Sequence, residues 1–271
     1  MHQRIRERLP HLPTLVASAE QYCTEQAALL AATKKTPLDD IFEHSGRRYR
    51  RVKAAILDIP HFRLDNPLDR IEDLETGEII DIERTEHDAF WIWAVIEVLR
   101  LTGVRIEELL EITHLGLVTC TLPKTGEIVP MLQIVPSKSN EERLLLVSPE
   151  LASVLAVIVS RLRSQNGGTI PLTTRYDTYE RVTGPQLPHL FQYRNGWSWQ
   201  CFGTTNIHRL MSAALARAGI TDAAGEPLRY TPHDFRRLWA TDAVSNGLPV
   251  HIAAKATVSP AAAGGSHVCD V

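Results

Sequence analysis

Hydrophobic residues recur at helical spacing through most of the chain. In the stretch that ends at Gly103, apolar side chains stand at i, i+3, i+4 and i+7, which predicts an amphipathic helix: Ile92, Val95, Ile96 and Leu99. Similar apolar stripes, several bounded by start and stop residues, predict further helices over residues 1–35, 105–112, 149–164, 204–219 and 232–247. Thr204 or Thr205 is placed to cap the fourth of these.

Strand-like alternation is confined to short stretches. Residues 125–135 and 142–148 read as two strands joined by a hairpin turn that carries Lys138. Shorter strand-like runs surround Ser45 and Gly46, and a small hairpin is expected within residues 74–82. The chain is therefore predicted to be an α+β protein, mainly helical, with a small antiparallel β-hairpin sheet. The other long segments are expected to be connecting or loop-rich regions: 60–86 and 166–200.

Composition adds few limits. The 271 residues suffice for one large domain, and an apolar content of 44% is enough for a sizeable core. The sequence has no run of about 18 apolar residues and no secretory signal, so no membrane partner is expected. Four widely separated cysteines form no metal-binding spacing and fit free thiols in a reducing cytoplasm: Cys23, Cys120, Cys201 and Cys269.

The net charge of −3 argues mildly against nucleic acid as a partner, but the charges are strongly segregated. Residues 46–53 hold five cations and no acid, whereas residues 58–88 hold eleven Asp or Glu against three Arg. A DNA-binding face needs only a local positive potential. The alternative is a solvated hairpin face. The candidate DNA-binding residues of this basic run are Arg47, Arg48, Arg50, Arg51 and Lys53.

A second concentration of positive charge stands at a predicted helix start. The pair Thr231–Pro232 makes a strong helix N-terminus, with His233, Arg236 and Arg237 in the first two turns. Cations are unfavourable at the positive end of a helix dipole, so a bound anion is expected to compensate them. The alternative is a solvated basic turn with Asp234 as its partner.

Arg105 and Lys138 are ambiguous when each is considered alone. Arg105 follows a glycine helix end and starts the next predicted helix, where an exposed arginine would pair with Glu108 or Glu111. Lys138 could be an ordinary lysine at a hairpin tip.

Together, these segments resemble the catalytic domain of the tyrosine recombinases, the phage-integrase family. "TGVRIEELLEI" around Arg105 is similar to the family's first arginine box, and "TPHDFRRLWATDAVSNGLP" is similar to its His-x-x-Arg box. Lys138 in "VPSKSNEERLLLVSPEL" matches the lysine of the hairpin that follows the first box. The resemblance covers residues 85–255.

The resemblance implies site-specific DNA recombination and integration, with Arg105, Lys138, His233 and Arg236 as catalytic residues and Arg237 as a further DNA contact. In the family, a tyrosine attacks a DNA phosphodiester and becomes linked to the 3′ phosphate. Two arginines stabilise the pentavalent phosphorus, the lysine protonates the leaving 5′ oxygen, and the histidine assists proton transfer at the nucleophile. Double-stranded DNA and other recombinase subunits are the implied partners; no metal or other cofactor is implied.

The end of the sequence departs from the family pattern. Residues 248–255 begin the helix that in the family carries Leu-Gly-His and then the tyrosine, but neither follows, and all six tyrosines precede the second box. Tyr230 is the one adjacent to that box. The expected organisation is a helical segment with a basic hairpin and an acidic linker, an integrase-like catalytic domain, and an aberrant, disordered tail: residues 1–84, 85–255 and 256–271.

The leading interpretation is a C-terminally truncated recombinase that binds DNA, lacks its nucleophile and is inactive in cis. A neighbouring subunit could instead donate a tyrosine in trans. The chain could also be a DNA-binding or regulatory protein on a recombinase scaffold, a non-functional gene remnant, or an unrelated helical anion-binding protein. The recombinase interpretation predicts that four side chains converge around a space the size of one phosphate: Arg105, Lys138, His233 and Arg236.

Overall fold

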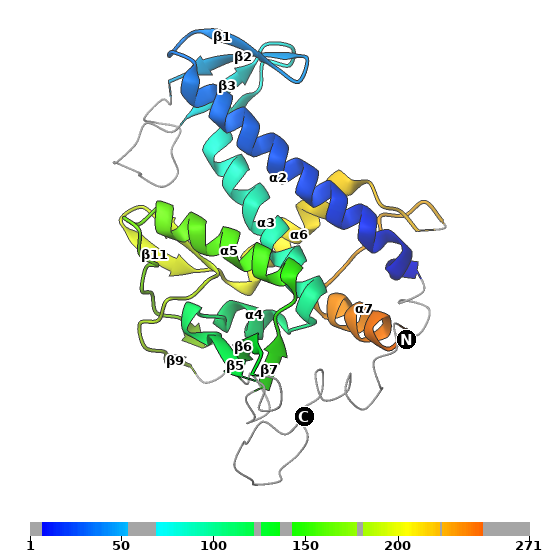
Figure 1. The fold of residues 1–271 in the computed structure, drawn as a ribbon. Coiled ribbons are helices and arrows are strands. Elements are labelled where there is room, and N and C mark those ends of the chain that lie inside the picture. Colours follow the sequence, from blue (N-terminus) through cyan, green and yellow to red (C-terminus); the bar gives the residue numbers. More distant parts are fainter. Residues whose placement is uncertain are drawn as a thin grey trace.

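The computed structural model describes residues 7–53, 69–121, 126–135, 143–177, 181–222 and 224–245. Lys138 and the predicted tail, residues 256–271, lie outside these ranges. After a short 3₁₀ helix, η1 (Leu9–His11), two long helices pack against each other, α2 (Leu12–Lys35) and α3 (Ile82–Thr102), as Figure 1 shows. The predicted fold class, mainly helical α+β with small antiparallel sheets, is confirmed.

Helix α3 is the central element of the structure. It contacts α2, α5 (Pro149–Ser164), α6 (Thr204–Ala218) and α7 (Pro232–Ser245) (Figure 1). The predicted apolar stripe of α3 is buried, but so are residues on its other faces: Trp91, Ala94 and Val98. The prediction of an amphipathic helix was therefore too narrow. Residues 89–99 of the helix are apolar on nearly all sides because other elements surround this part of it.

A three-stranded antiparallel sheet follows α3 in the chain. The short helices α4 (Ile106–Glu111) and η3 (His114–Gly116) lead into β5 (Leu117–Thr121), β6 (Ile128–Ile134) and β7 (Arg143–Leu146). The pair β6 and β7 is the predicted hairpin, and β5 extends it on the other side of β6. Leu132 lies opposite Leu117 on one side and Leu145 on the other, so all three point from one face of the sheet into the core.

A four-stranded antiparallel sheet joins the basic run to the acidic stretch. Its strands lie in the order β1 (Ile41–His44), β2 (Arg47–Val52), β3 (Arg70–Asp73) and β4 (Ile79–Asp81). Both small hairpins expected from the sequence are present. Residues 60–86 were expected to be a connecting region with one small hairpin; the pairing of β3 with the basic strand β2 was not predicted. A small core lies under this sheet: Leu29, Tyr49, Ile71 and Ile82.

The segment 166–200 contains two further hairpins, which the sequence did not predict. They are formed by β8 (Tyr176–Asp177) with β9 (Val182–Thr183), and by β10 (Gln192–Asn195) with β11 (Ser198–Cys201). Each strand has at most four residues. Runs this short are too brief for an alternating pattern to be distinguished from a loop.

Local sequence signals explain most of the helix ends. Gly103 and Gly219 adopt the left-handed conformation at the ends of α3 and α6, as predicted. Ser148 accepts a hydrogen bond from the backbone of Leu151 at the start of α5. The prediction that Thr204 or Thr205 caps α6 was wrong, because both residues already lie in the first turn and Gly203 occupies the cap position.

The predicted domain boundary between residues 84 and 85 falls inside α3. Leu15 and Ala19 of α2 belong to the same hydrophobic core as α3, and so pack with the segment that carries the two arginine boxes. None of the described helices combines the length and the apolar character that a membrane span requires.

Candidate functional site

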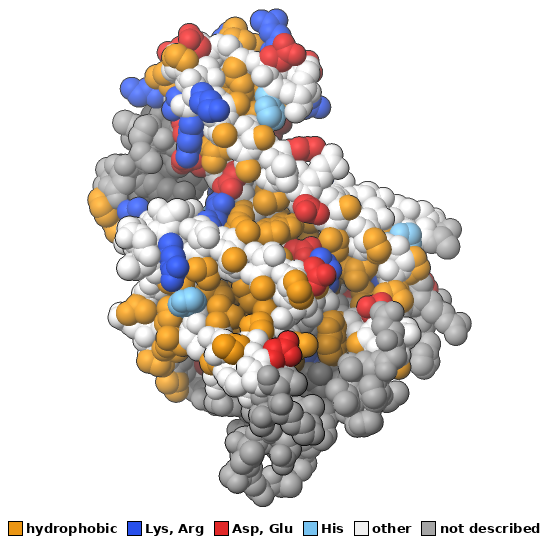
Figure 2. Space-filling view, viewed as in Figure 1, with side chains coloured by type: hydrophobic (Ala, Val, Ile, Leu, Met, Phe, Trp, Pro, Cys, Tyr) orange, Lys and Arg blue, Asp and Glu red, His pale blue; other side chains and the backbone are white. Residues whose placement is uncertain are grey.

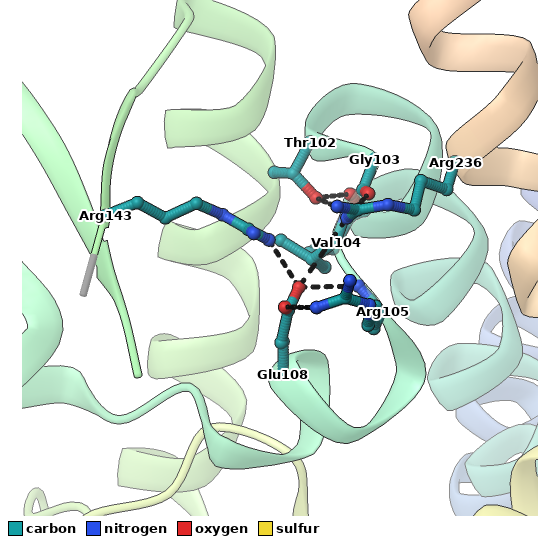
Figure 3. Close-up of polar contacts among 8 residues, drawn as sticks. Thr102, Gly103, Val104, Arg105, Glu108, Arg143 and Arg236 are labelled. Carbon is teal, nitrogen blue, oxygen red and sulfur yellow. Dashed lines mark hydrogen bonds and ion pairs between the residues drawn. The ribbon is translucent and has the colours of Figure 1, made fainter. Parts of the chain in front are cut away.

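Three arginines meet on one buried carboxylate (Figure 3). Glu108 is 1% exposed. Its Oε1 accepts a hydrogen bond of 3.0 Å from Nη1 of Arg105, and its Oε2 accepts one from Nη2 of Arg143. Nη1 of Arg236 lies 3.8 Å from Oε2, close enough for an ion pair. The sequence-predicted residues Arg105 and Arg236 are thus brought to a single point.

The start of α4 fixes two of these groups relative to each other. Arg105 is the N-cap residue, and Oε2 of Glu108 accepts its backbone N–H at 2.8 Å. This is the half of a capping box in which the acidic residue three positions into the helix reaches back to the cap. Glu108 therefore has a structural reason to point toward the helix start, where the arginine side chains lie.

Gly103 connects α3, α4 and α7. It has a φ of 61°, and a Cβ at this position would stand 2.9 Å from ring atoms of Trp239 in α7. Its carbonyl oxygen accepts a hydrogen bond of 2.8 Å from Nη1 of Arg236 (Figure 3). The glycine thus allows the chain to reverse, lets α7 approach α3, and orients the second arginine.

The start of α7 is organised by Asp234. Its Oδ2 accepts hydrogen bonds from the backbone N–H of Thr231 at 2.9 Å and from the Thr231 hydroxyl at 2.8 Å. The Thr231 hydroxyl thus donates, whereas the expected cap would have accepted a bond from the helix. Nε of Arg8 lies 3.7 Å from the same oxygen. Arg236 is only 6% exposed, so it does not belong to a solvated basic turn.

The guanidinium of Arg236 carries more positive charge than its surroundings neutralise. Burial lowers the pKa of Arg236 to about 10; Arg143 and Arg105 act in the same direction, and Glu108 opposes them. Its Nη2 is buried and has no hydrogen-bond partner among the described residues. Three guanidiniums around one carboxylate leave an excess of positive charge, which favours an anion at this place.

His233 faces the same group of charges. Partial burial lowers the pKa of His233, Arg237, Arg236 and Arg105 lower it further, and only Asp234 raises it. The imidazole is therefore neutral at pH 7, with one nitrogen able to accept a proton. Its exposed position at the second residue of α7 leaves it accessible to a ligand.

Sequence reasoning missed Glu108 as a buried residue and missed Arg143 altogether. The signal for Glu108 was its place three residues after a helix start, where an acidic side chain can cap the helix. The signal for Arg143 was strand alternation. Arg143 and the buried Leu145 are two positions apart, so they lie on the same face of β7. A charged residue on an inward face needs a partner.

The basic run is largely paired within its own sheet. Arg47, Arg50 and Arg51 of β2 contact Asp73, Glu72 and Asp69 at 3.5, 3.3 and 2.5 Å. Figure 2 shows basic and acidic side chains intermixed over this part of the molecule. Arg48 and Lys53 are exposed, and neither has an acidic partner within the described ranges. Of the five cations in the basic run, Arg48 and Lys53 are therefore the best placed to contact DNA, and that role stays a prediction.

Tyr230, the tyrosine next to the second box, is held away from solvent. Its side chain is 4% exposed and its hydroxyl donates to the backbone carbonyl of Arg8. Burial raises the pKa of Tyr230 to about 12. A phenol in this position is a poor nucleophile. Within the described part of the chain, no group of three or more His, Cys, Asp or Glu residues is placed to hold a metal ion.

Comparison with known proteins gives structural likenesses only. No protein-family model and no curated protein matches the sequence. The structure is similar to that of XerA recombinase, with 21% identity and a TM-score of 0.40 over 61% of this chain and 47% of that one. It is also similar to XerH site-specific recombinase bound to difH substrate, with 13% identity and a TM-score of 0.41 over 62% of this chain and 39% of that one. The chain spans less than half of the length of these structures.

Replacing Gly103 by Ala is expected to lower the free energy of unfolding by more than the conformational penalty alone. A residue with a Cβ loses about 1–2 kcal/mol in the left-handed region, and overpacking against Trp239 adds roughly 1–3 kcal/mol. Gly219→Ala is the matched control, because Gly219 has the same φ of 61° and no atom within 4 Å of an added Cβ. Urea unfolding measures both, and equal losses would contradict the packing role of Gly103.

Inorganic phosphate is expected to raise the pKa of His233. Besides partial burial, the repulsion of three arginines lowers this pKa, and a bound anion offsets that repulsion. NMR titration of the imidazole with and without phosphate measures the change. A His233 titration that is indifferent to phosphate would argue against an anion beside it.

Proposed function

We propose that the chain binds duplex DNA and holds one phosphodiester with the guanidiniums of Arg105 and Arg236. The observation that carries this proposal is the convergence of three arginines on the single carboxylate of Glu108. A phosphodiester oxygen can accept paired N–H bonds from a guanidinium, which is why arginine suits this ligand better than lysine. The buried, unpartnered Nη2 of Arg236 supplies a donor for it.

The proposed chemistry is that of the tyrosine recombinases. A tyrosine oxygen attacks phosphorus, the bond to the 5′ oxygen breaks, and the protein becomes linked to the 3′ phosphate. Arg105 and Arg236 would stabilise the added negative charge of the pentavalent state. The neutral imidazole of His233 would accept the tyrosine proton, and Lys138 would protonate the leaving oxygen. The roles proposed for Arg105, Arg236 and His233 rest on the resemblance in sequence together with this local geometry. The role proposed for Lys138, which lies outside the described residues, rests on the resemblance alone.

Further DNA contacts are proposed for cations outside the central group. Arg237 is adjacent to Arg236 on α7, and its charge acts on His233. Arg48 on β2 and Lys53 directly after it are exposed, whereas Arg47, Arg50 and Arg51 would have to leave their acidic partners to bind a phosphate. Other recombinase subunits remain proposed partners, since sharing of active sites could provide the tyrosine.

One observation favours a second function, DNA binding or regulation without strand cleavage. Tyr230 is the described tyrosine closest in sequence to the second box, and its hydroxyl is engaged with the backbone of Arg8. Its raised pKa of about 12 opposes formation of a phenolate. In this second function, the arginine pair would bind a phosphate tightly and no covalent link would form.

Duplex DNA is expected to bind with a steep salt dependence, because arginine contacts release counterions from the phosphates. Arg236→Lys should weaken binding about tenfold although it keeps the charge, since lysine cannot donate a paired set of hydrogen bonds. Arg163→Lys, at an exposed arginine of α5, is the matched control and should bind as the unchanged protein does. Fluorescence anisotropy at several salt concentrations measures both. Failure to bind at low salt would favour the gene-remnant interpretation.

The chain alone is expected to form no covalent adduct with a DNA suicide substrate. The described arginines and His233 can stabilise a phosphorane, but they cannot take the place of the tyrosine that attacks phosphorus. A denaturing gel of labelled DNA incubated with the protein tests this. A protease-sensitive band that survives denaturation would show that the chain has a nucleophile, and Tyr230→Phe would then establish whether it is Tyr230.

A further inference from the structure

Arg143 differs from the other two arginines of the site in what it contacts. It is the first residue of β7, whereas Arg105 starts α4 and Arg236 belongs to the first turns of α7. Its Nη2 donates directly to Oε2 of Glu108 (Figure 3). Its side chain is 15% exposed, and its Nε is buried without a hydrogen-bond partner in the described part of the chain.

The three arginines do not contact the carboxylate of Glu108 equally closely. Arg143 and Arg105 both make hydrogen bonds to the carboxylate, but Nη1 of Arg236, at 3.8 Å, is beyond hydrogen-bond distance and donates instead to the carbonyl of Gly103. Arg236 therefore has only a longer ion pair with the carboxylate. Arg143 and the backbone N–H of Arg105 together occupy Oε2, the oxygen of Glu108 that is nearest to Arg236.

We propose that Arg143 is a positioning residue of the site: it holds Oε2 of Glu108 so that this carboxylate does not neutralise Arg236 in place of the phosphodiester. The proposal rests on the proposed function and deepens it. Arg143 itself makes no contact with the ligand. Without it, the buried carboxylate would keep Arg105 but lose its other directly bonded guanidinium, and it would turn toward Arg236. Glu108 would then compete with the phosphate for Arg236.

Rescue of DNA binding by a second substitution distinguishes a positioning role of Arg143 from a merely structural one. In Arg143→Gln, DNA affinity should fall by roughly tenfold, which is within the range for residues that act on a ligand through a neighbour. The slope of affinity against salt concentration should stay unchanged, because no phosphate contact is lost. The double variant Arg143→Gln with Glu108→Gln should regain most of the affinity, because the competing carboxylate has become a neutral amide.

The titration of His233 tests the proposed movement of Glu108 without DNA. In Arg143→Gln, movement of Glu108 toward Arg236 and Arg105 would reduce their combined repulsion of His233. NMR titration should then give a higher pKa for His233 than in the unchanged protein. The main charges that lower the pKa of His233 are Arg237, Arg236 and Arg105. Arg143→Lys keeps a cation on Glu108 and should leave the His233 titration unchanged.

The experiment measures anisotropy of a labelled duplex DNA, the salt slope and the His233 titration for five proteins: the unchanged chain, Arg143→Gln, Arg143→Lys, the double variant and Arg100→Gln. Arg100 is the matched control, since it forms an ion pair with Glu97 at 2.6 Å on α3, outside the site. Circular dichroism checks that each protein is folded. If Arg143→Gln does not fold, Arg143→Lys and the double variant decide, and both should bind DNA within about threefold of the unchanged chain.

The outcomes separate the two proposals. If the unchanged chain does not bind DNA, the proposed function fails, and the His233 titration still decides whether Arg143 positions Glu108. If the unchanged chain binds but Arg143→Gln binds equally well, the positioning role is overturned. A reduced salt slope in Arg143→Gln would show that Arg143 contacts a phosphate itself. Binding by the double variant that is no better than that of Arg143→Gln would also overturn the proposal.

Discussion

The structure around the two arginine boxes depends on one buried carboxylate. Glu108 caps the start of α4, and it draws arginines from three separate elements to one point. A buried charge without partners would be strongly destabilising, so α4, β7 and α7 are constrained to meet where Glu108 lies. The same constraint creates the feature on which the proposed function rests. One negative charge cannot satisfy three positive ones, so an excess of positive charge is left at this point.

Gly103 serves the same arrangement from the backbone side. Because it has no Cβ, α7 approaches the end of α3 closely enough for Arg236 to reach its carbonyl oxygen. Arg236 is thus oriented by a neutral acceptor, and this hydrogen bond does not neutralise the charge of its guanidinium. The two acceptors therefore act differently. The carboxylate of Glu108 attracts all three arginines, and the carbonyl of Gly103 fixes the orientation of Arg236.

The sequence predicted the helices and the β6–β7 hairpin, because each leaves a local signal in spacing or in a helix boundary. Arg105 and Arg236 were singled out by the family resemblance of their segments, and the structure places both beside Glu108. The sequence did not predict that β3 pairs with the basic strand, or that Arg143 lies on Glu108. Both are contacts between distant segments, and they depend on how the strands are arranged in space. Amphipathicity also misled the description of α3, since a helix covered on all sides shows no polar face. The roles proposed for Lys138 and for the basic run remain predictions.

The hydrogen bond between the Tyr230 hydroxyl and the carbonyl of Arg8 joins residues 222 positions apart. Contacts of such long sequence separation form late in folding, because a large loop must close first. Arg8 also lies beside Asp234, which organises the start of α7. During synthesis, Arg105 and Arg143 leave the ribosome long before Arg236 can join them. The three arginines around Glu108 therefore come together only once α7 has been made and has packed against α3.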